Sequence, residues 1–101
     1  MKGRYTVNEI KKIVTPIAEE YGVESLSLFG SYSKGTAALG SDVDFLIEKG
    51  ALRGLFALSG FRLALEDALE LPVDLITRDI SDKSFLDMIA GDEVLLYRSA
   101  R

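Results

Sequence analysis

The chain of 101 residues contains no cysteine and no histidine. The absence of cysteine excludes disulfides, thiolate zinc sites and thiol nucleophiles, and the absence of histidine removes the commonest metal ligand and general base. Any catalysis must therefore use carboxylates, hydroxyls and amines. This set of side chains favours Mg²⁺ and related hard cations, because these ions take oxygen ligands.

The sequence also lacks a run of about 18 uncharged apolar residues, and its first four residues, Met-Lys-Gly-Arg, do not begin a signal peptide. We therefore expect no membrane span and a cytoplasmic location. The net charge is −4 and the twelve Lys and Arg residues are scattered, so we do not expect unaided binding of nucleic acid. The length and the hydrophobic content of 48% predict one domain over residues 1–101.

The hydrophobic pattern predicts helices that alternate with strands. Thr6 and Glu9 have the spacing of a capping box, Pro16 predicts a kink or a local irregularity, and Gly22 is a stop signal. The expected helices cover residues 7–21, most of 52–69 and 81–90, with a short helix or turn over 31–36, and the expected strands cover residues 23–29, 42–48, 73–77 and 93–97. This order predicts an α/β (α+β) fold, with helices packed on a small sheet.

Three aspartates are the candidate catalytic residues and metal ligands. Asp42 and Asp44 are two residues apart on an expected strand, so their side chains share a face, with Cα atoms about 7 Å apart. Asp74 interrupts an apolar strand that we expect beside theirs. Phosphoryl and nucleotidyl transfer use such a cluster because two metal ions about 4 Å apart can stabilise the attacking and leaving oxygens.

Each aspartate taken singly is also consistent with a solvent-facing position on an exposed sheet face. However, Leu46 shares a face with Asp42 and Asp44, and Ile76 shares one with Asp74. That face is therefore expected to be partly covered. Partly buried carboxylates are costly without a cation or hydrogen bonds, so we interpret the three together as a metal site.

Residues 30–35, Gly-Ser-Tyr-Ser-Lys-Gly, predict a site for phosphate oxygens. Gly30 allows close approach of the backbone, Ser31 at an expected helix start offers a hydroxyl and N–H groups, and Lys34 adds a positive charge. We assign Gly30, Ser31, Lys34 and Ser41 to nucleotide binding, although each alone also fits an ordinary turn or a solvated side chain. The apolar residues from 55 to 65 are assigned to the core or to a partner interface.

These residues together resemble the minimal nucleotidyltransferase (MNT) domains of the DNA polymerase beta superfamily. The pattern of that family is Gly-Ser, a few residues, Gly, and then Asp-x-Asp, which residues 29–35 and 41–47 match, and residues 73–75 resemble its third acid. The family often has Ala-Arg where this chain has Ser33 and Lys34, and lysine lacks the bidentate fork of arginine. The resemblance implies a mixed sheet of about four strands packed with helices.

The resemblance also implies an activity. Asp42, Asp44 and Asp74 would hold Mg²⁺, or alternatively Mn²⁺, and Asp74 would help to activate the acceptor. A nucleotide, AMP from ATP as the first expectation, would move to an acceptor hydroxyl with release of pyrophosphate.

Stand-alone members of this size often pair with a helical HEPN-type toxin, and in some cases a tyrosine of the toxin is the acceptor. The alternative is a non-catalytic antitoxin or scaffold that neutralises a helical partner by binding. Transfer to RNA is disfavoured by the acidic charge and by the lack of an RNA-binding domain. The sequence leaves open which nucleotide is used, what the acceptor is and whether the chain forms a homo-oligomer.

Overall fold

The computed structural model describes residues 5–38 and 40–100, which contain one four-stranded sheet. Its strands are β1 (Ser25–Phe29), β2 (Val43–Glu48), β3 (Val73–Thr77) and β4 (Val94–Arg98), in the spatial order β3-β2-β1-β4. β1 is antiparallel to both β2 and β4, whereas β3 runs parallel to β2. The predicted α/β fold with a small mixed sheet is confirmed.

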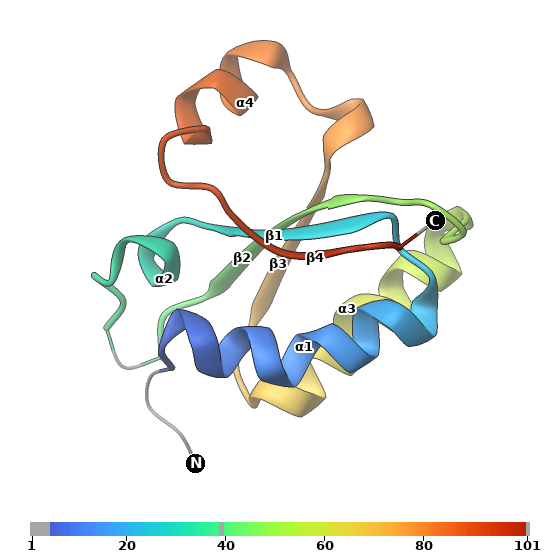
Figure 1. The fold of residues 1–101 in the computed structure, drawn as a ribbon, viewed down its shortest axis with the longest axis horizontal. Helices are drawn as coiled ribbons and strands as arrows, with labels where there is room; N and C mark the ends of the chain where they lie inside the picture. The colour runs from blue at the N-terminus through green and yellow to red at the C-terminus, as the bar shows by residue number, and fades with distance from the viewer. Residues whose placement is uncertain (1–4, 39, 101) are drawn as a thin grey trace.

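Helices cover both faces of this sheet (Figure 1). The long helices α1 (Val7–Tyr21) and α3 (Gly54–Leu69) lie on one side, and α4 (Lys83–Ile89) lies on the other. Two short elements, α2 (Ser31–Lys34) and the 3-10 helix η1 (Arg78–Ile80), follow β1 and β3. No helix in the described ranges has both the length and the apolar character needed to cross a bilayer.

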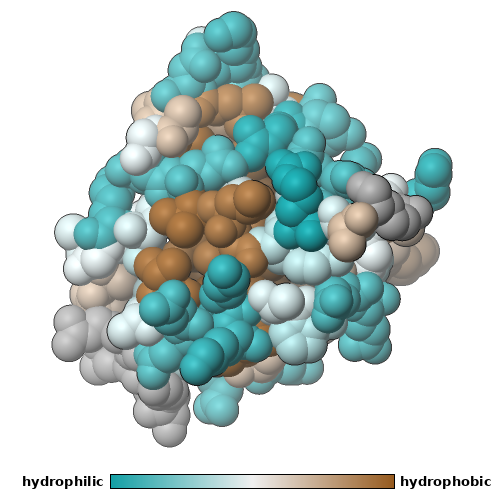
Figure 2. Space-filling view, viewed as in Figure 1, coloured by the Kyte–Doolittle hydropathy of each residue, from teal (hydrophilic) through white to brown (hydrophobic). Residues whose placement is uncertain are grey.

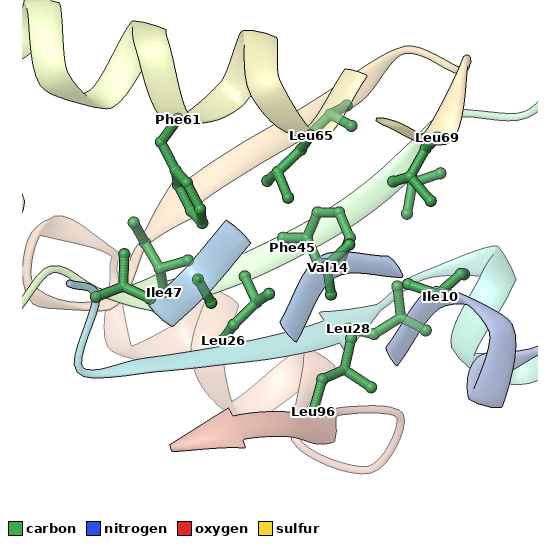
Figure 3. Close-up of a cluster of buried hydrophobic side chains, with 14 of the residues drawn as sticks. Ile10, Val14, Leu26, Leu28, Phe45, Ile47, Phe61, Leu65, Leu69 and Leu96 are labelled. Carbon is green, nitrogen blue, oxygen red and sulfur yellow. The ribbon is translucent and has the colours of Figure 1, made fainter. Parts of the chain in front are cut away.

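The main core lies between the sheet and the two long helices. Alternate side chains of β1 and β2 point to this side, because successive residues of a strand face opposite ways. They meet the buried face of α3 and three fully buried residues of α1 (Figure 3). The labelled members of this cluster are Ile10, Val14, Leu26, Leu28, Phe45, Ile47, Phe61, Leu65, Leu69 and Leu96.

A second, smaller cluster fixes α4 on the other face. Phe29, Leu46 and Ile89 are buried there, with Ile76, Phe85 and Leu86 packed against them. The ring centroids of Phe29 and Phe85 are 5.8 Å apart, with the rings edge to face. Leu46 of β2 and Ile76 of β3 point to the face opposite the main core, and so do Asp44 and Asp74, which are two residues earlier in each strand. Helix α4 therefore covers part of the face that also carries these two acids.

Most predicted boundaries differ from the structure by one or two residues. The expected strand at residue 23 begins at Ser25, because the αL cap at Gly22 places the Val23 amide on the carbonyl of Ala18. Pro16 does not interrupt α1, which is helical from Val7 to Tyr21 and buries Ile10, Val14 and Ala18. The other corrected bounds are α2 at 31–34, β2 at 43–48, α3 at 54–69, α4 at 83–89 and β4 at 94–98.

Apolar side chains also remain on the surface. Figure 2 shows an apolar area in the middle of the viewed face, where α1 and β4 lie in Figure 1. The apolar run from residue 55 to 65 is divided: Phe61 and Leu65 are core residues, whereas Leu55 and Phe56 are 81% and 97% exposed. Leu63 is exposed too, so the core assignment holds for only part of this run.

Candidate active site

Strand pairing brings the predicted aspartates together. In the parallel register of β2 and β3, Asp44 lies directly beside Asp74, and neighbouring strands are about 4.8 Å apart. Asp42 immediately precedes β2, two residues before Asp44. We call the sheet face that carries Asp44, Leu46, Asp74 and Ile76 the acidic face.

The electrostatics of this cluster are unfavourable for three charged carboxylates. Asp44 is partly buried, whereas Asp42 and Asp74 are exposed. Burial raises the pKa of Asp44 above its ordinary value, and the neighbouring charges of Asp74 and then Asp42 raise it further. Between the described residues, no lysine or arginine forms an ion pair with any of the three. Within residues 5–38 and 40–100, the negative charge of the site is therefore not paired with a cationic side chain.

Gly30, the first residue of the 30–35 segment, lies against Asp44 of this cluster. It follows Phe29, whose register partner on β2 is Asp44. A Cβ at Gly30 would lie 2.2 Å from Oδ2 of Asp44, and the backbone has φ 77° and ψ −153°, a conformation that only glycine adopts readily. The carboxylate of Asp44 thus occupies the space that a side chain at position 30 would need.

Two more predicted nucleotide-binding residues, Ser31 and Lys34, lie at the two ends of α2. Ser31 begins α2, directly after Gly30. The Nζ atom of Lys34 lies 3.8 Å from Oδ2 of Asp92, and both side chains are about half exposed. Asp92 was not predicted, because nothing in the local pattern of its turn links it to residue 34.

Ser41 already has a local partner. Its Oγ accepts a hydrogen bond of 2.9 Å from the amide of Ala38, and its own amide donates to the Ala38 carbonyl at 3.0 Å. These two bonds close the turn that leads into β2. Ser41 therefore orders the approach to Asp42.

The residues of the acidic face fit a divalent cation. The donors are carboxylate oxygens, the ligands that Mg²⁺ prefers, and a cation would relieve the charge that raises the pKa of Asp44. Among the described residues, no three acidic side chains are already close enough together to hold a metal ion. Asp42 and Asp74 are exposed, so their side chains can rotate toward an ion without disturbing the core.

Comparison with known proteins finds related sequences and a similar fold. The family model described as a nucleotidyltransferase domain matches residues 10–97. A Methanocaldococcus jannaschii protein, provisionally named as a protein adenylyltransferase, is 34% identical over 88 residues, which cover 87% of this chain and 95% of that protein. The protein adenylyltransferase MntA of Thermococcus cleftensis is 35% identical over 77 residues, with 72% of this chain and 78% of that protein covered.

A solved structure has the same fold. The crystal structure of a toxin–antitoxin with AMP-PNP superposes with a TM-score of 0.74 and 24% identity, and the match covers 93% of this chain and 76% of that chain. At this identity the superposition shows that the sheet and helices correspond.

Proposed function

This chain belongs to the nucleotidyltransferase domain family and is a nucleotidyltransferase of the minimal type, and from this premise we propose that it transfers AMP from ATP to a hydroxyl group of a protein partner. The observation that carries the proposal is the meeting of Asp44, Asp74 and the backbone of Gly30 on the acidic face. The relatives named above as protein adenylyltransferases support the choice of AMP and of a protein acceptor.

The residues around Asp44 have separate roles in this reaction. Gly30 and Ser31 receive the triphosphate, because the Ser31 hydroxyl can donate to a phosphate oxygen and the glycine at position 30 leaves room for the Asp44 carboxylate to lie against the start of α2. Lys34 is free to contact phosphate only after its weak, exposed ion pair with Asp92 opens. We therefore assign Lys34 an auxiliary role.

The acceptor side of the site is at Asp74. The acceptor oxygen forms a bond to the α-phosphorus, and the bond from that phosphorus to the bridging oxygen of the β-phosphate breaks, which releases pyrophosphate. Asp74 lies exposed beside Asp44 and can hold the proton that the acceptor hydroxyl loses before it passes to water. Asp42, Asp44 and Asp74 would hold Mg²⁺, which would neutralise the charge of the phosphates and of the acids.

We assign the protein partner to the helical HEPN-type toxins. Support comes from the resemblance to minimal nucleotidyltransferases that pair with HEPN-type toxins and from the fold, which this chain shares with a chain of a toxin–antitoxin structure solved with AMP-PNP. The large apolar side chains that this chain leaves exposed, Phe56 at 97% among them, are also typical of a surface that contacts another protein. The same exposure favours the second candidate function, in which the chain neutralises its partner by binding alone.

Labelled ATP separates these two functions. The purified chain is incubated with Mg²⁺, a co-expressed HEPN-type protein and ATP that is labelled on either the α- or the γ-phosphate. We expect label from α-labelled ATP alone on the partner, with none for Asp44→Asn. The surface variant Asp87→Asn is the matched control, because Asp87 is an exposed residue of α4 whose ion pair, with Lys83, lies on the same helix. A stable complex without label from the unmodified chain would leave only the binding function.

A further inference from the structure

β3 is an edge strand that carries Asp74 and pairs with the strand of Asp44. Within the described chain it pairs with β2 alone. The amide of Val43 donates to the carbonyl of Pro72 at 2.9 Å, so the Pro72 carbonyl points toward β2. The amide of Val73 instead donates to Oε2 of Glu66 at 2.9 Å, away from β2. Backbone groups alternate along a strand, so both the N–H and the C=O of Leu75 point to the open edge.

The open edge is short and centred on Leu75. At its start, the Val73 amide already donates a hydrogen bond to the carboxylate of Glu66. At its end, the carbonyl of Thr77 accepts a hydrogen bond of 2.7 Å from the hydroxyl of Ser81. The groups between these two points have no strand partner in the part of the chain that the structure describes. An added segment of about three residues would satisfy them.

An acidic depression adjoins the start of this edge. It has a volume of about 350 Å³ and is lined by Glu66, Glu70, Leu71 and Pro72. Glu66 is already paired with Arg62 at 3.0 Å, whereas Glu70 is exposed. The depression lies at the C-terminal end of α3, whose last turn has no basic residue. The helix carbonyls and the Glu70 carboxylate together favour a cation at this place.

We propose that the β3 edge binds the acceptor protein through an extended, basic segment that adds to the sheet as a fifth strand. The added strand would lie about 4.8 Å from β3, and a side chain opposite Asp74 would have its Cβ about 5 Å from that of Asp74. Such a side chain lies on the acidic face. An acceptor hydroxyl there is next to Asp74, and a lysine or arginine of the same segment lies over Glu70.

This inference rests on the proposed function, because it names how the acceptor of that reaction docks. It also explains why a glutamate occupies position 70, where the backbone conformation favours glycine. Glu70 is the only non-glycine residue with positive φ (58°) among the described residues, at a helix cap where glycine is preferred. Replacement by glycine should therefore stabilise the fold while it removes the charge that attracts the basic segment.

The test measures KM for the HEPN-type acceptor with α-labelled ATP and Mg²⁺. Leu75→Pro removes the outward N–H but leaves the ladder with β2, whereas Leu75→Ala loses the same packing and keeps the N–H. We expect the acceptor KM to rise at least fivefold more for Leu75→Pro than for Leu75→Ala, with equal affinity for ATP. Glu70→Gly should raise both the melting temperature and the acceptor KM, and Glu20→Gln, which removes the same charge from an exposed site on α1, should change neither.

A second measurement is hydrogen exchange of the amides of residues 73–77 with and without the acceptor. Slower exchange at Leu75 when the acceptor is present is the expected result. If label reaches the acceptor but Leu75→Pro and Leu75→Ala have equal KM values and β3 gains no protection, the edge proposal is wrong and the proposed function stands. If no label reaches any acceptor although ATP and Mg²⁺ bind, both proposals are refuted.

Discussion

Replacement of Asp44 by asparagine should make the metal-free protein more stable while it abolishes transfer. Asp44 lies beside Asp74, and burial and both neighbouring acids raise its pKa. In the folded protein the charged form of Asp44 is therefore disfavoured, so at neutral pH its ionisation lowers the free energy of unfolding. Asparagine keeps the shape of the side chain and removes this charge.

The size of the effect follows from the strand spacing. Two carboxylates about 6 Å apart repel each other by about 0.7 kcal/mol at a dielectric constant of about 80 and by about 3 kcal/mol at about 20. Asp74 is exposed, so we take the lower part of this range, about 1 kcal/mol. For a domain of this size, that gain corresponds to a rise in Tm of about 4–8 °C.

Melting curves with and without Mg²⁺ check this reasoning. Mg²⁺ at ten times its dissociation constant should stabilise the parent protein by about 1.4 kcal/mol and leave Asp44→Asn unchanged. The control Asp87→Asn, which loses only an exposed pair with Lys83, should shift the unfolding free energy by less than about 0.5 kcal/mol and keep its response to Mg²⁺. A metal-free Asp44→Asn protein that is destabilised by about 1–3 kcal/mol and still transfers AMP would show that Asp44 accepts structural hydrogen bonds instead.

Three further results are expected. Gly30→Ala should abolish transfer and lower Tm, because the new Cβ would lie 2.2 Å from Oδ2 of Asp44; unchanged kinetics would show that this contact is not needed. Glu48→Gln should lower stability at neutral pH. The Ser25 hydroxyl, and then Arg98, lower the pKa of Glu48 in the folded protein. The stabilisation from charged Glu48 is therefore present above the ordinary glutamate pKa of about 4.3 and is lost as the pH falls further. If the stability difference between parent and Glu48→Gln does not shrink in acid unfolding curves, this origin is contradicted. Ser31→Ala should raise KM for ATP, measured with α-labelled substrate, whereas an equal KM would remove Ser31 from the triphosphate site.

Local sequence patterns were sufficient for the elements themselves. The capping box of Thr6 and Glu9 is present with both hydrogen bonds, and Gly22 ends α1 in the αL conformation with φ 74°. Both features depend on residues within four positions of each other, so the sequence could specify them directly. The shared face of Asp44 and Leu46 was equally predictable, because alternation along a strand has a period of two.

The parts that depend on distant residues could be confirmed only in three dimensions. The pairing of Asp44 with Asp74, the fit of the Asp44 carboxylate against Gly30 and the ion pair of Lys34 with Asp92 each join segments that are separate in the chain. Strand order and register decide these contacts, and they result from the packing of the whole sheet against its helices rather than from any local pattern. The same packing leaves β3 at an open edge beside the acids, because no described strand follows Thr77 on that side.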